Sequence, residues 1–64
     1  MGTFEVYADK SGEFRWRLLA TNGKSIATSG EGYTEKRGCL RGIEIVRELA
    51  PGAKVDDQTV AAKE

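Results

Sequence analysis

The chain has 64 residues, with ten Lys and Arg against ten Asp and Glu, so its formal net charge is zero, and it has one Cys and no His. This length predicts a single domain near the lower size limit for independent folding. The lone Cys39 excludes an internal disulfide, the lack of His excludes the usual zinc ligand sets, and charge neutrality argues against a strong non-specific nucleic-acid binder.

Residues 3–8 alternate between apolar and polar side chains, which is typical of a strand. Residues 13–20 alternate in the same way, and the turn-forming stretch 9–12 separates the two segments. The sequence therefore predicts a β-hairpin in which Trp16 lies at the centre of the apolar face, where a helix packs on the sheet.

The register of this hairpin follows from its apolar face. Pairing Ala8 with Phe14 keeps the apolar side chains of both strands on one side, because a slip of one residue would turn one set outward. The same register places Glu5 opposite Arg17, as an opposite-charge pair on the outer face.

Asn22-Gly23 predicts a second hairpin, because both residues tolerate the positive φ angles of a two-residue type I′ turn. Residues 24–29 would then form the third strand. In this register Leu19 lies opposite Ile26 on the outer face of the sheet.

Residues 35–49 predict a single helix. Thr34 suits its N-cap position, and Ala50-Pro51-Gly52 ends it. Gly38 and Gly42 each cost about 1 kcal/mol relative to Ala in a helix, which indicates that the helix approaches the sheet or a partner closely. The apolar stripe expected to be buried comprises Cys39, Leu40, Ile43, Val46 and Leu49.

The C-terminal residues predict a short strand over residues 53–56, centred on Val55, and then a tail. The element order is β-β-β-α-β, an α+β fold with an antiparallel sheet and one helix on one face. We assign residues 1–57 to a single domain and residues 58–64 to a flexible or weakly helical tail. The last strand requires a sheet edge with which to pair.

Several segments of the chain carry a family resemblance. They are Phe4-Glu5-Val6-Tyr7, Arg15-Trp16-Arg17-Leu18, Asn22-Gly23, Ile26-Ala27-Thr28-Ser29 with Glu31 and Tyr33, Gly42-Ile43, Ala50-Pro51, and Ala53, Val55 and Asp57. On these residues the chain resembles the YegP-like domain family, small bacterial domains of unknown function. The resemblance covers residues 3–57, and Leu19 and Ser25 depart from the family pattern.

The resemblance implies an assembly. The family builds its fold from two β-β-β-α-β units, either as tandem repeats or as two subunits, which share one sheet and exchange their last strands. Because this chain holds one unit, the resemblance implies a homodimer with Ala53, Val55 and Asp57 in the interface. A partner chain also fits the size of the domain, since the free energy of apolar burial and the ordering entropy nearly cancel in so small a chain. The family supplies no catalytic residues.

Two surfaces are candidate binding sites. Gly30, Gly32 and Tyr33 lead into the helix, whose N-terminal N–H groups attract anions. A tight strand-to-helix turn that needs glycines is the favoured explanation, because no Lys follows in the position of a phosphate-binding loop and Glu31 repels anions. Tyr7, Arg15 and Arg17 share the outer sheet face and could contact nucleic acid, although the same face can be a solvated surface in which Arg17 pairs with Glu5.

The remaining chemistry argues against an enzyme. Cys39 lies on the apolar stripe with no His to activate it, so we expect a buried structural thiol, no catalytic residues, no metal and no cofactor. No apolar run reaches the length of a membrane span, and the lone Cys without an export signal suggests the cytoplasm. We expect a homodimeric binding or scaffold module. The alternative is a weak nucleic-acid-binding module that uses Arg15 and Arg17. No particular small-molecule ligand is indicated.

Overall fold

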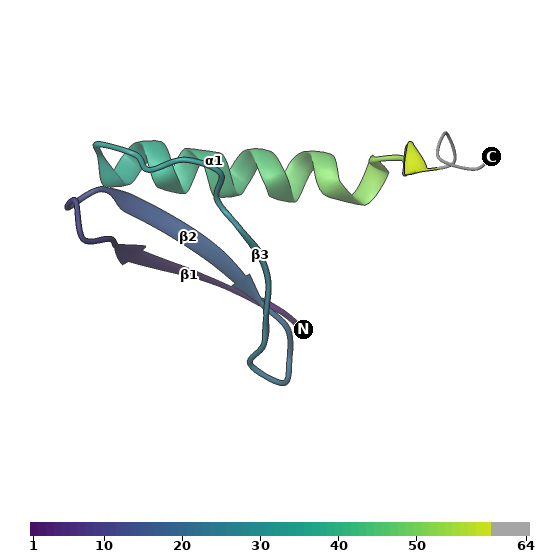
Figure 1. Ribbon diagram of the computed structural model, residues 1–64, viewed down its shortest axis with the longest axis horizontal. Coiled ribbons are helices and arrows are strands. Elements are labelled where there is room, and N and C mark those ends of the chain that lie inside the picture. Colours follow the sequence, from purple (N-terminus) through teal and green to yellow (C-terminus); the bar gives the residue numbers. More distant parts are fainter. Residues whose placement is uncertain (60–64) are drawn as a thin grey trace.

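The computed structural model describes residues 1–59, in which one helix crosses one face of a three-stranded antiparallel sheet (Figure 1). This arrangement confirms the α+β class and the order of the first four predicted elements. Residues 60–64, the larger part of the predicted tail, lie outside the described residues. The elements are β1 (Thr3–Ala8), β2 (Phe14–Leu19), β3 (Ser25–Thr28), α1 (Lys36–Leu49) and a 3-10 turn η1 (Ala50–Gly52), and the strand order is β1-β2-β3.

The first hairpin has the predicted register. Ala8 pairs with Phe14 and Glu5 with Arg17. The turn closes through a hydrogen bond of 3.0 Å from the Gly12 N–H to the Asp9 carbonyl, and Gly12 has a φ of 84°. A glycine is favoured at this position because only glycine adopts positive φ without steric cost.

The second hairpin differs from the predicted type I′ turn. Among residues 1–59 only Gly12 and Gly23 have positive φ, so Asn22 does not adopt the conformation that this turn requires. Instead, the Gly23 N–H donates to the Ala20 carbonyl at 2.9 Å, and the Asn22 side chain accepts a hydrogen bond from the Lys24 N–H at 3.1 Å. The longer turn shifts the register between Leu18 and Leu19.

The shift creates a bulge in β3. Leu19 lies opposite Ser25 and not opposite Ile26 as predicted, while Leu18 keeps its predicted partner Ala27. Ile26 is the extra residue, and 64% of its surface is exposed. Bulges weaken an edge strand as a template for further pairing.

After β3 the chain leaves the sheet and returns to it. Ser29 is buried, and its Oγ accepts a hydrogen bond from the Trp16 N–H at 3.3 Å. Tyr33 pairs again with Phe14 through two backbone hydrogen bonds of 2.8 Å each. Residues 30–32 therefore form a short excursion whose two ends are both held on β2.

This second pairing corrects the predicted helix start. Glu35, not Thr34, is the N-cap residue, with an extended φ of −127°, and no side chain caps the first turn. The reason is that the bridge from Tyr33 to Phe14 keeps the chain extended up to Glu35. The Glu35 carboxylate bonds instead to the Arg37 guanidinium at 3.1 Å.

The core lies between β2 and α1. Trp16, Cys39 and Ile43 are buried, as the sequence predicts, and the Phe4 ring meets Trp16 edge-on with centroids 5.4 Å apart. Tyr33 packs over two glycines of α1, which explains the glycines predicted to mark a close approach. Around this centre pack Phe4, Val6, Phe14, Leu18, Tyr33 and Val46.

Two members of the predicted apolar stripe are exposed. Leu40 is 46% exposed and Leu49 is 66% exposed. The three strands lie along the N-terminal part of α1, and the helix extends beyond the sheet at its C-terminal end (Figure 1). Leu49 therefore lacks a packing surface among residues 1–59.

The predicted last strand pairs with no part of residues 1–59. Residues 53–58 have no regular secondary structure, and they continue from α1 away from the sheet (Figure 1). Val55, the centre of this segment, is 92% exposed. Ala53, the first residue of this segment, has an extended backbone conformation, with φ −75° and ψ 136°.

Candidate functional site

The outer sheet face brings together the three residues predicted there. The Arg17 guanidinium lies over the Tyr7 ring, 4.1 Å from its centroid, and the Arg17 Nε lies 3.1 Å from a Glu5 carboxylate oxygen. The predicted pairing of Glu5 with Arg17 is confirmed. The Tyr7 ring and the Glu5 carboxylate thus hold the Arg17 side chain against the outer face of the sheet.

Arg15, the second cation of this face, is bound to a turn residue. Its Nε lies 2.6 Å from an Asp9 carboxylate oxygen, and the other Asp9 oxygen accepts the N–H groups of Ser11 and Glu13 at 2.9 and 3.0 Å. The hydrogen bond from Arg15, with the two N–H groups, lowers the pKa of Asp9, and the same contact raises the pKa of Arg15. Both cations of the outer face therefore carry acidic partners.

The candidate loop residues do not join this cluster. Tyr33 points to the helix, where its ring covers Gly38, and Gly32 lies against the Glu13 side chain. Gly30 has open space around its Cα. The three residues occupy separate surroundings, and a binding role for them stays a prediction.

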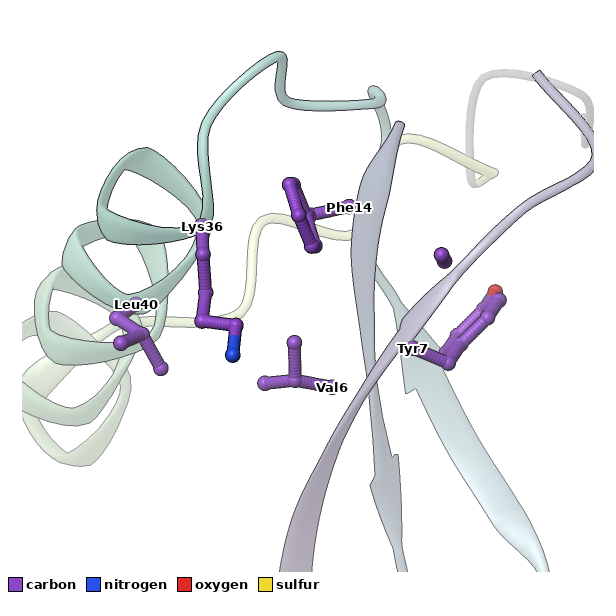
Figure 2. Close-up of a pocket in the computed structure, with 6 residues that line it drawn as sticks. Val6, Tyr7, Phe14, Lys36 and Leu40 are labelled. Carbon is purple, nitrogen blue, oxygen red and sulfur yellow. The ribbon is translucent and has the colours of Figure 1, made fainter. Parts of the chain in front are cut away.

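The structure reveals a pocket that the sequence did not predict. It has a volume of about 400 Å³ and lies between the unpaired edge of β1 and the first half of α1 (Figure 2). The signal that could have found it is the spacing of Lys36 and Leu40 on one helix face, opposite the helix-facing residues of β1. Its lining residues are Val6, Tyr7, Ala8, Phe14, Lys36 and Leu40.

The side chains give this pocket an apolar floor and one cation. Val6 and Phe14 rise from the sheet, and Leu40 closes the helix side (Figure 2). The Lys36 side chain extends from the start of α1 so that its ammonium group lies between Leu40 and Val6 (Figure 2), and this group forms no ion pair among residues 1–59. The pocket could therefore accept an apolar group that carries an anion beside it.

The predicted interface residues Ala53, Val55 and Asp57 are all exposed. The Asp57 carboxylate accepts hydrogen bonds from the N–H and hydroxyl groups of Thr59 at 2.9 and 2.5 Å, which lower the pKa of Asp57. Asp57 is thus held as an anion near the end of an otherwise free segment.

The described residues offer no assembled reactive centre. Cys39 is fully buried and burial raises the pKa of its thiol, which disfavours the nucleophilic thiolate. Within residues 1–59 no three His, Cys, Asp or Glu side chains are grouped as a metal site. In the same part of the chain, α1 is too short and too polar to cross a bilayer.

A three-stranded sheet, one covering helix and a free segment after the helix define a small α+β domain. The chain belongs to the family described as "Domain of unknown function (DUF1508)", whose model matches residues 9–57. A "UPF0339 protein" of Treponema denticola is 59% identical over 54 residues, which cover 84% of this chain and 91% of that protein. These matches fit the YegP-like resemblance.

Two further relatives differ from this chain in length or in the kind of organism. The "UPF0339 protein in ptx operon 5'region" of Stutzerimonas stutzeri is 60% identical over 50 residues, which cover 78% of this chain and only 44% of that protein. A UPF0339 protein of the archaeon Methanosarcina acetivorans is 49% identical over 55 residues, covering 86% of this chain and 93% of that protein. The family therefore includes an archaeal member and is not restricted to bacteria, which corrects the bacterial origin that the resemblance implied.

Solved structures share the fold. A protein from Haloferax volcanii superposes with a TM-score of 0.82 at 45% identity, over 88% of this chain and 93% of that one. Protein ATU0232 from Agrobacterium tumefaciens superposes with a TM-score of 0.73 at 35% identity, over 97% of this chain and 98% of that one.

Proposed function

We propose that the chain is a non-enzymatic binding or scaffold module that acts as a homodimer, in which residues 53–57 of each copy pair with the other copy. The observation that carries this proposal is the exposed segment after α1, whose central Val55 is 92% exposed. A β-branched residue in an extended segment gains free energy from pairing with a sheet edge, and within residues 1–59 this segment pairs with none.

The dimensions of the single chain support a partner. Its accessible surface is 5225 Å², whereas a folded monomer of 7.0 kDa exposes about 4,000 Å². The radius of gyration, 14.4 Å, is likewise larger than the roughly 11 Å of a compact chain of this length.

Two other observations are consistent with this proposal. The aligned residues make up 44% of the Stutzerimonas protein, which leaves room there for a second unit of the same size. The buried, unpaired thiol of Cys39 suits a reducing compartment, and we place the module in the cytoplasm.

Light scattering tests the dimer at micromolar concentration. The full chain should have a mass of about 14 kDa, twice 7.0 kDa. Truncation after Gly52 removes the free segment and should give a monomer, whereas truncation after Thr59 keeps the segment and should leave the dimer intact. A mass of about 7 kDa for the full chain would contradict the proposal.

The second candidate is a weak nucleic-acid-binding module. The stacking of Arg17 on Tyr7 favours it, because sheets that bind single strands present aromatic and cationic side chains together. The acidic partners of Arg15 and Arg17 weigh against it. Fluorescence anisotropy with a labelled oligonucleotide at low salt would decide whether the chain binds nucleic acid.

In this measurement, binding should fall with salt and should be lost when Arg15 and Arg17 are both changed to Ala. The control changes Arg37 and Arg47 to Ala, because these two arginines lie on α1 and not on the sheet. No binding at low salt, or equal losses in the two double variants, would remove this candidate.

A further inference from the structure

Among residues 1–59, the indole N–H of Trp16 is a buried donor of the core without a hydrogen-bond partner. Trp16 as a whole is only 8% exposed. Its backbone is paired, because its N–H donates to the Ser29 Oγ at 3.3 Å and its carbonyl accepts the Ser29 N–H at 2.9 Å. Buried donors in folded proteins are almost always bonded to protein or to ordered water, so this indole N–H requires an acceptor.

A second buried nitrogen of residues 1–59, the Arg17 Nε, also lacks a well-aligned hydrogen bond. It belongs to the outer face of the sheet, and it lies 3.1 Å from a Glu5 carboxylate oxygen, so an anion compensates its charge. The Trp16 indole is neutral and lies in the core between β2 and α1. Only a hydrogen-bond acceptor can therefore satisfy it.

Gly42 of α1 lies beside both the indole and a second polar group. A Cβ atom at Gly42 would lie 3.6 Å from the Trp16 Nε1 and 2.5 Å from the Tyr33 hydroxyl oxygen. The indole nitrogen, which comes from β2, and the hydroxyl, which comes from the loop before α1, thus lie next to the same point of the helix. The two groups do not bond to each other directly.

A water molecule has the chemistry that these two groups need. An indole N–H can only donate a hydrogen bond, whereas a water molecule accepts it and donates one of its own protons to the hydroxyl oxygen. A buried water needs at least two polar partners, and the indole and the hydroxyl supply them. An apolar group in the same place would leave the indole donor unbonded.

We infer that Gly42 opens a binding site for one internal water molecule, which accepts the Trp16 indole N–H and bonds to the Tyr33 hydroxyl. The water joins β2 to the loop that leads into α1, and it thereby helps to hold the helix on the sheet. The site lies within the core of one chain, so the inference does not depend on the proposed homodimer. It gives the Tyr33 hydroxyl a role beyond the packing of its ring.

A high-resolution crystal structure of the full chain tests the site directly. Density for a water oxygen should lie about 2.7–3.2 Å from both the Trp16 Nε1 and the Tyr33 hydroxyl oxygen. No density there, or a direct hydrogen bond between the two side chains, would overturn the inference. In solution, the NMR resonance of the indole N–H is unambiguous because Trp16 is the one tryptophan of the chain, and it should move upfield in Tyr33→Phe.

Thermal unfolding at a fixed protein concentration gives an independent test, because one substitution should act with opposite sign in two backgrounds. Tyr33→Phe alone should lower the Tm by about 4–8 °C, as the loss of one hydrogen bond does in a domain of this size. In Gly42→Ala, where the added Cβ displaces the water, Tyr33→Phe should instead raise the Tm.

Tyr7→Phe is the matched control for this measurement. It removes the other tyrosine hydroxyl of the chain and keeps the ring against Arg17, so it should shift the Tm by less than about 3 °C. A Tm that Tyr33→Phe leaves unchanged or raises in the otherwise unaltered chain would contradict the water bridge. An equal loss in Tyr7→Phe and Tyr33→Phe would contradict it as well.

Discussion

At the scale of single residues, Asp9 organises the first hairpin more than any other side chain. One carboxylate oxygen accepts two turn N–H groups, and the other binds the Arg15 guanidinium at 2.6 Å. The sequence predicted the turn itself, because Asp, Ser and Gly favour turns. It did not predict the ion pair, because Arg15 reaches back over a turn whose geometry depends on Gly12.

These contacts predict acid-sensitive stability. The folded pKa of Asp9 lies below its ordinary value of 3.8, mainly because of the hydrogen bond from Arg15. The contribution to stability is therefore complete above pH 3.8 and is lost as the pH falls through the lower folded pKa. Urea unfolding at several pH values should show a loss of stability in acid that is smaller in Asp9→Asn, which keeps the turn acceptor but lacks the charge. Identical pH profiles would contradict this role.

At the scale of elements, the packing of α1 depends on one aromatic side chain from the preceding loop. A Cβ atom at Gly42 would lie 2.5 Å from the Tyr33 hydroxyl oxygen and 3.2 Å from the ring carbon that bears it. At Gly38 the closest approach to the same ring would be 3.4 Å, an ordinary contact distance. The two glycines look alike in the sequence, but only Gly42 is required by close packing.

The two glycines should therefore respond oppositely to substitution by Ala. Gly38→Ala should stabilise the fold by up to about 1 kcal/mol through helix propensity. Gly42→Ala should destabilise it by about 1–3 kcal/mol because the packed Tyr33 ring must move. Thermal or urea unfolding measures both effects. Adding Tyr33→Phe to Gly42→Ala should recover part of the loss, and no recovery would contradict the hydroxyl contact as its cause.

The boundaries of the first three strands and of the helix agree with the prediction to within about one residue, because they follow from side-chain periodicity, whereas the predicted strand over residues 53–56 does not form. The departures have a common physical cause. The turn type at Asn22-Gly23 and the N-cap at Glu35 each depend on hydrogen bonds to neighbours whose positions are set by the folded sheet. Local sequence preference alone does not determine this turn type or this N-cap position.

At the scale of the whole molecule, the single chain buries little. Among residues 1–59 the buried apolar side chains are Trp16, Cys39 and Ile43, while Leu49 and Val55 are largely exposed. If the proposed dimer covers part of this surface, folding and association are coupled, because the unfolded chains do not associate.

Coupled association predicts that stability depends on protein concentration. The thermal midpoint Tm of the full chain should rise when the concentration is raised from about 5 to about 500 μM, by several degrees in a domain of this size. The chain truncated after Gly52 should melt at a lower Tm that does not change with concentration. A Tm of the full chain that is equally constant would mean that the single chain accounts for its own stability.

The sequence by itself determined the class of fold, the faces of the strands and the helix, the Glu5–Arg17 pair and the buried Trp16 and Cys39. These features follow from the alternation and spacing of side chains along the chain. Only the tertiary structure decided which stripe residues stay exposed, why Gly42 is required, and where the pocket beside β1 forms. The physical reason is that these features arise between elements, where the offset of α1 on a narrow sheet leaves space that no local pattern encodes.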